Sequence, residues 1–274
     1  MPRLALGATI GLVALCVVAG EGHAAETPTP RIVGGGKANA AGWQFAVALE
    51  QKRRLICTAS LIAPTKVLTA AHCVKSGKRK QLSVLAGSPW ISPKRRAARI
   101  KVTAVQLDPK YNGRKDTRDF AVLTLASAPA ALPIALPTQA EAKAATQAGG
   151  TVRSAGWGTR SPLGFNVAQR LKTAKERVYP ARKCQRVYSK PLFNSVTMIC
   201  ALGGLVRRVP GRLRLHSTTC TGDSGGPVVA STPTGPRLVG AVSAGVFPCG
   251  VGGPSIYARV ASQLAFIQRA LAMP

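Results

Sequence analysis

The chain has 274 residues, 46% of them hydrophobic, which is enough apolar material for one large β domain or two small ones. Its 38 lysines and arginines against nine acidic residues give a formal net charge of +29. Aromatic residues make up only 5% of the chain, which argues against a stacking platform for single-stranded nucleic acid, so we expect no dedicated nucleic-acid module. The charge predicts attraction to anionic surfaces or polyanions through basic patches, although such charge is also common on solvated faces without a partner.

Residues 1–24 have the pattern of a secretory signal peptide. Arg3 precedes an apolar run over residues 4–18, and small residues follow up to Ala24, after which we expect cleavage. The run is shorter than the ~20 residues of a membrane-spanning helix, so we expect no membrane span once the signal is removed. We therefore predict a secreted protein, extracellular or periplasmic. An enzyme anchored by an uncleaved N-terminus is the alternative.

Export changes the meaning of the cysteines. An even number of them beyond the signal peptide predicts disulfides, with the pairing left open. No CxxC pair is present and histidines are scarce, so we expect no metal and no cofactor. The cysteines concerned are Cys57, Cys73, Cys184, Cys200, Cys220 and Cys249.

From residue 25 onward the chain reads as a short leader followed by many short strands. Residues 25–31 are polar and rich in proline, and we expect them to be a detachable activation segment ending at Arg31. Residues 126–150, rich in alanine and proline, predict a connection between two halves. The one helix we expect is Ala261 to Met273, where leucine and isoleucine recur at helical spacing. The predicted strands, separated by glycine and proline, include residues 45–50, 82–87, 120–126, 151–158 and 237–245.

Three separate segments carry the residue types of nucleophilic catalysis. His72 stands beside Cys73 in LTAAHC, Asp119 opens the strand-like run DFAVLTL, and Ser224 lies in CTGDSGGP. Each alone is an ordinary structural or turn residue, but a serine nucleophile needs a histidine base and a carboxylate to orient it. Asp116 lies three residues upstream of Asp119 without the following strand pattern, so we prefer Asp119.

These segments make the chain similar to the chymotrypsin/trypsin-like serine endopeptidases over residues 32–272. The resemblance implies an all-β fold of two six-stranded antiparallel β-barrels, with the active site in the cleft between them and a C-terminal α-helix. It implies a protease domain over 32–274, with barrels at about 32–140 and 150–260 and the helix at about 261–272, and we expect a monomer. It further implies the disulfides Cys57–Cys73, Cys184–Cys200 and Cys220–Cys249. The motifs are IVGG at 32–35, TAAHC at 69–73, DFAVLTL at 119–125, GWG at 156–158, GDSGGP at 222–227, VSAG at 242–245 and PSIYARV at 254–260.

The resemblance also implies roles for the candidate site residues. His72 would take the proton of Ser224, and Asp119 would hold the imidazole in the right tautomer. The backbone N–H groups of Gly222 and Ser224 would form the oxyanion hole. Ser243 would support Asp119 and the substrate backbone.

An activation step follows from the same resemblance. Cleavage after Arg31 would free the α-amino group of Ile32, and this ammonium would fold inward to pair with Asp223. A buried pair of this kind acts as a switch more than as a source of stability. The protein would then be a zymogen.

The resemblance is weakest in the substrate pocket. Thr218 stands where trypsin-type relatives carry an acid at the pocket floor, and Ser255 replaces a frequent glycine. Burying an arginine or lysine there without a counter-charge is unfavourable, so we expect a small or medium uncharged residue at P1, the residue before the cleaved bond. An acidic P1 residue, favoured by His216 and the basic field, is the minority interpretation. The predicted pocket residues are Thr218, Thr219, Ser243, Gly245 and Ser255.

Two hypotheses from different classes follow. The first is a serine endopeptidase that hydrolyses polypeptide substrates through an acyl-enzyme. The second is a catalytically silent homologue that binds anionic surfaces through its charge. Presence of the histidine, aspartate, serine and glycine of the active site favours the enzyme. The arginines between residues 200 and 220 are a candidate docking patch for an anionic partner: Arg207, Arg208, Arg212 and Arg214.

Overall fold

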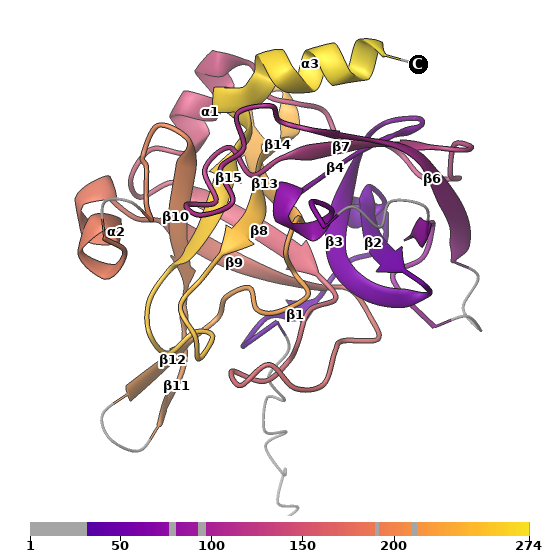
Figure 1. The fold of residues 1–274 in the computed structure, drawn as a ribbon. Coiled ribbons are helices and arrows are strands. Elements are labelled where there is room, and N and C mark those ends of the chain that lie inside the picture. Colours follow the sequence, from indigo (N-terminus) through magenta and orange to yellow (C-terminus); the bar gives the residue numbers. More distant parts are fainter. Residues whose placement is uncertain (1–31, 77–80, 93–96, 190–191, 210–212, 274) are drawn as a thin grey trace, which may run out of the picture.

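The computed structural model describes residues 32–76, 81–92, 97–189, 192–209 and 213–273. The predicted signal peptide and activation segment, including Arg31, lie outside the described residues, as does Arg212. Within the described part the chain folds into two β-barrels side by side, drawn in indigo to magenta and in pink to yellow in Figure 1.

The first barrel is closed by six antiparallel strands in the order β2-β3-β4-β7-β6-β5. Its strands are largely apolar, and their inward side chains, such as Leu49, Leu61, Leu68 and Leu123, have no exposed surface. The strands are β2 (Ala46–Gln51), β3 (Arg54–Ala63), β4 (Lys66–Thr69), β5 (Leu82–Ala86), β6 (Ala98–Leu107) and β7 (Ala121–Leu125).

The second barrel is closed in the order β8-β9-β10-β15-β14-β13, with β13 pairing back to β8. The short strand β1 (Gly36–Lys37) is added to it through β9, so the start of the described chain lies against the second barrel. A two-stranded ribbon, β11 (Leu205–Val209) with β12 (Leu213–His216), projects from the body (Figure 1). The barrel strands are β8 (Thr151–Gly156), β9 (Lys172–Val178), β10 (Met198–Gly203), β13 (Pro227–Thr232), β14 (Gly235–Ala244) and β15 (Ser255–Arg259).

The helices are short and peripheral. The predicted C-terminal helix is confirmed as α3 (Leu264–Ala272), preceded by a 3-10 turn at Val260–Gln263. The sequence reasoning missed α1 (Gln139–Ala145) and α2 (Ala181–Val187), which have seven residues each. None of the helices in the described residues is long and apolar enough to cross a membrane. Further 3-10 turns are Ala41–Trp43 and Ala71–Cys73.

The predicted fold of two six-stranded antiparallel barrels with a C-terminal helix is thus confirmed. The three disulfide pairings are confirmed too. On the chain-entropy model, closing loops of 16 to 29 residues stabilises the fold by about 3 kcal/mol for each bridge. The bridges are Cys57–Cys73, Cys184–Cys200 and Cys220–Cys249.

Candidate active site

His72 and Asp119 form a close pair at the edge of the first barrel. His72 lies in the 3-10 turn after β4, and Asp119 lies just before β7, the strand that pairs with β4. The Nδ1 atom of His72 is 2.7 Å from Asp119 Oδ2, and its backbone N–H donates to Asp119 Oδ1 at 2.9 Å. The carboxylate is fully buried, whereas the imidazole is 24% exposed. A proton on Nδ1 that is held by the carboxylate leaves Nε2 free to accept one.

The pKa of His72 reflects two opposed effects. Burial lowers it, but the hydrogen bond and charge of Asp119, helped by the charge of Asp116, outweigh burial and raise the pKa above its ordinary 6.5. Lys75 acts in the lowering direction. The structure therefore favours the protonated imidazole more than water does, which suits a base that must receive a proton during a reaction.

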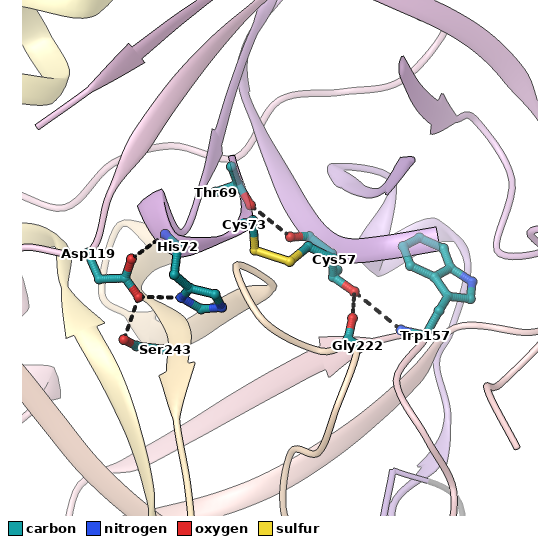
Figure 2. The surroundings of a disulfide bond; sticks show 9 residues. Cys57, Thr69, His72, Cys73, Asp119, Trp157, Gly222 and Ser243 are labelled. Atoms are coloured by element: carbon teal, nitrogen blue, oxygen red, sulfur yellow. Dashed lines mark hydrogen bonds and ion pairs between the residues drawn. A yellow bond between two sulfur atoms is a disulfide. The ribbon is translucent and has the colours of Figure 1, made fainter. Parts of the chain in front are cut away.

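Ser243 connects this pair to the second barrel. It lies on β14, and its hydroxyl donates to Asp119 Oδ2 at 2.6 Å. Figure 2 shows Asp119 between His72 and Ser243, with the Cys57–Cys73 disulfide beside the histidine. The carboxylate thus accepts three hydrogen bonds, which fix its orientation across the junction of the two barrels.

Ser224 lies in the turn before β13, and a residue of the first barrel holds that turn. The backbone N–H of Thr58, on β3, donates to the Ser224 carbonyl at 2.9 Å, and the Thr58 hydroxyl donates to the Gly222 carbonyl at 3.1 Å. Among the described residues, no hydrogen bond joins Ser224 Oγ to His72. Such bonds are often long in a free enzyme and tighten when substrate binds.

The turn presents unused backbone donors. Within the described chain, the N–H groups of Gly222 and Ser224 have no protein acceptor, whereas those of Asp223, Gly225 and Gly226 all do. Gly222 has φ +92°, a conformation that glycine adopts without a side-chain clash. Two free N–H groups, one on Ser224 itself and one on Gly222 two residues before it, are the donors that an oxyanion hole requires.

Asp223 belongs to the same turn, and its side chain is fully buried. Its carboxylate accepts backbone N–H groups from Gly158 at 2.8 Å and Cys220 at 2.9 Å. Burial raises its pKa to about 7, against the lowering effect of those two bonds. Its neighbourhood has no cationic partner in the described part of the chain. Ile32 is also fully buried, with φ +33°, a strained conformation for a β-branched residue.

A cavity of about 280 Å³ opens beside Ser224. Three of the predicted pocket residues line it, namely Thr219, Ser243 and Gly245. Thr218 and Ser255 are buried and are not among its lining residues; Ser255 Oγ accepts the Thr219 hydroxyl at 2.9 Å and lies 2.6 Å from Thr218 Oγ1. The remaining lining residues are Cys220, Thr221, Val242, Ala244, Val246, Phe247 and Cys249.

Other predicted residues lie elsewhere. His216 is not among the residues lining the cavity; its Nδ1 is 3.0 Å from the Gly203 carbonyl, so it gives no support to an acidic P1 residue. Asp116 accepts a hydrogen bond from Tyr111 at 3.1 Å and acts on His72 only through its charge. Cys57, Cys73 and His72 lie close together, but the disulfide leaves no thiolate to bind a metal.

Sequence reasoning missed several residues that shape the site. The Thr58 hydroxyl holds the nucleophile turn through the Gly222 carbonyl, and the backbone N–H of Gly158 holds the Asp223 carboxylate. No sequence signal distinguished Thr58, since its role depends on which strands face each other. Gly158 belongs to the GWG motif, but only the fold shows that the Asp223 carboxylate lies close to its Cα, where a side chain would not fit.

Comparison with known proteins agrees with this geometry. The family model described as Trypsin matches residues 32–267. A trypsin from Saccharopolyspora erythraea is 33% identical over 84% of this chain and 93% of its own length. Kallikrein-11 from Mus musculus is 29% identical over 95% of this chain and 88% of its own. Glucanase inhibitor protein 3 from Phytophthora infestans is 31% identical over 77% of this chain and 76% of its own.

Solved structures show the same relationship. Neuropsin, a serine protease expressed in the limbic system of mouse brain, superposes with a TM-score of 0.71. It is 28% identical, with 86% of this chain and 98% of neuropsin covered. The chain therefore belongs to the trypsin family and is a serine endopeptidase of that class.

Proposed function

We propose that the protein hydrolyses peptide bonds through an acyl-enzyme formed on Ser224, with His72 as the base and Asp119 as the orienting carboxylate. The observation that carries this is the pairing of His72 with the buried Asp119, because it fixes the tautomer whose Nε2 can accept a proton. In the reaction, Nε2 takes the Ser224 proton as Oγ attacks the carbonyl, then delivers it to the leaving amine.

The N–H groups of Gly222 and Ser224 would stabilise the oxygen that becomes negative in the tetrahedral intermediate. Loss of one such donor typically raises the barrier by ~2.7–4 kcal/mol. Water then attacks the acyl-enzyme by the same route, with His72 again as base, and regenerates Ser224.

We also propose activation by cleavage after Arg31. Burial raises the pKa of the Asp223 carboxyl group, and a cation beside it would offset that burial; the new Ile32 ammonium would supply this cation. The strained φ of Ile32 supports the same step, because cleavage removes the preceding carbonyl that makes a positive φ unfavourable. The pair would raise the amine pKa above its free ~7.7–8, so activity would fail as pH rises through the new value.

For substrate choice, we propose a small or medium uncharged P1 residue rather than arginine or lysine. Thr219 in the cavity wall and the buried Thr218 and Ser255 near it supply hydroxyl groups but no carboxylate. Secretion, with removal of residues 1–24, and a monomeric state complete the proposal. The three disulfides are typical of secreted proteins.

The proposal is tested by incubating a diverse peptide mixture with the full chain, with the chain processed to begin at Ile32, and with its Ser224→Ala variant. We expect cleavage by the processed chain alone, and loss of that cleavage after acetylation of the Ile32 amine. Cleavage that persists in Ser224→Ala contradicts the nucleophile, and cleavage that survives acetylation contradicts the switch. N-terminal sequencing of exported protein tests the leader, because a chain still beginning at Met1 would indicate the anchored alternative.

A second candidate function is a silent homologue that binds anionic surfaces. The relatives named as glucanase inhibitor proteins show that this family contains chains named for inhibition rather than proteolysis. In the ribbon, Arg208 and Arg214 stand directly opposite each other on β11 and β12, and like charges in that position repel unless an anion lies between them. Correctly processed chain that cuts nothing between pH 6 and 9, yet binds a polyanion column at physiological salt, would favour this function.

A further inference from the structure

Three large apolar side chains are exposed to solvent beside the cavity that contains Ser224. Leu163 is 54% exposed, Phe165 is 66% exposed and Phe247 is 63% exposed. Phe247 is a lining residue of the cavity, whereas Leu163 and Phe165 lie on the loop of residues 157–171 that connects β8 to β9. Single exposed apolar side chains are ordinary, but several gathered at one place mark a surface that binds something.

The loop is attached to both segments that line this part of the cavity. The backbone N–H of Thr159 donates to the Thr221 carbonyl at 2.8 Å, and the Pro162 carbonyl accepts the backbone N–H of Cys249 at 2.9 Å. Thr221 and Cys249 are both lining residues. Gly164 lies so close to the rim that a Cβ added to it would be 3.8 Å from the Phe247 ring. The loop therefore extends the cavity wall outward.

The backbone of the loop holds its two apolar side chains at the tip. An isolated antiparallel bridge between Thr159 and Val167 closes the loop at its base. Within it, the backbone N–H of Gly164 donates to the Ser161 carbonyl at 3.0 Å, and Gly164 has φ +79°, which glycine adopts readily. A loop fixed by its own hydrogen bonds loses less conformational freedom when it binds a partner.

The loop also differs from the rest of the chain in charge. The chain has a formal net charge of +29, yet Arg160 is the one charged residue in residues 157–169. An exposed surface that has little charge and several large apolar groups is complementary to an apolar partner rather than to an anion. Leu163, Phe165 and Phe247 are called the apolar platform below.

We propose that the apolar platform binds a large apolar side chain of the polypeptide substrate, at a position outside P1. The inference rests on the proposed function and adds a second determinant of specificity to the P1 residue. The substrate is the occupant because the platform is continuous with the cavity. A substrate whose P1 side chain enters the cavity places its neighbouring residues, about 3.3 Å apart along an extended chain, beside the rim. Exposed aromatic groups at such a place are effective anchors for binding.

The test uses a series of peptides with one common P1 residue, chosen as the one that the peptide mixture identifies. The reference peptide has serine at the flanking positions, and each other peptide carries phenylalanine at one of them. The ratio of kcat/KM for each peptide to that for the reference is measured with the chain that begins at Ile32. We expect one flanking position at which phenylalanine is favoured about tenfold, because part of its ring leaves water on the platform.

Substitutions on the platform separate direct contact from general damage. In the double variant Leu163→Ser with Phe165→Ser, and in Phe247→Ser, this ratio should fall toward one, whereas a change that merely disturbs the active site lowers both values together. Val196→Ser is the matched control and should keep the ratio. Val196 is 71% exposed, but it lines a separate cavity together with Arg259.

If no flanking position favours phenylalanine, or if the preference persists in the double variant, the inference is overturned and the proposed function stands. Sedimentation in which the unmodified chain dimerises and the double variant does not would assign the platform to a second copy and would also overturn it. If no peptide is cut, the proposed function fails separately. The same ratios are then measured as dissociation constants with the Ser224→Ala variant, where a preference for phenylalanine supports the platform and its absence overturns it.

Discussion

Glu176 should make the stability of the protein depend on pH in a way that one substitution removes. Burial raises its pKa to about 7 in the folded chain, against an ordinary 4.5, and the difference corresponds to about 3 kcal/mol. Between these two values the folded state binds a proton that the unfolded state has lost. The stabilisation is therefore fully present below pH 4.5 and lost as pH rises through 7. Glu176→Gln carries no such proton.

The free energy of unfolding of Glu176→Gln, minus that of the unmodified chain, should accordingly grow by about 3 kcal/mol between pH 4 and pH 8. Urea unfolding with the disulfides intact measures this by tryptophan fluorescence, with Ser224→Ala in both chains to prevent self-digestion. Other titrating groups, Asp223 included, are present in both chains and largely cancel. Ser154→Ala is the control, because loss of the hydrogen bond from its hydroxyl to Glu176 raises the Glu176 pKa and extends the slope upward. Parallel stability curves would refute the reasoning.

Two further predictions concern the active site itself. The acidic limb of the kcat/KM profile should have its midpoint above pH 6.5, because Asp119 raises the His72 pKa. Asp116→Asn should lower that midpoint, and Lys75→Gln should raise it, because the charges of these residues act on His72 in opposite directions. Shifts of the opposite sign would contradict the assignment of His72 as the base. Gly158→Ala should destabilise the fold by about 1–3 kcal/mol and reduce activity, because a Cβ there would lie 2.5 Å from Asp223 Cγ. Urea unfolding and peptide cleavage test the second, with Gly36→Ala, which meets nothing within 4 Å, as the control that should change neither.

The sequence alone determined the features that depend on residue type and order. Glycine and proline between short apolar runs predicted an all-β fold, and the separated His72 and Asp119 were predicted to meet, as they do in the structure. A capping box was also readable at Thr138 and Glu141, where the Thr138 hydroxyl and the Glu141 carboxylate each accept the other's backbone N–H. Helix α1 was nevertheless missed, because its seven residues carry too little periodicity to detect.

Only the tertiary structure decided which polar groups face inward. Glu176 stands between Lys175 and Arg177, and three successive charged residues normally indicate a solvated strand. The register of β9, in which Glu176 lies opposite both Val152 on β8 and Gly203 on β10, turns this one carboxyl group into the barrel. Thr58 likewise reaches Ser224 only because the two barrels pack together. Such contacts join residues far apart in the chain, so no local pattern records them, and the direction in which a strand faces is fixed by its partners rather than by its own side chains.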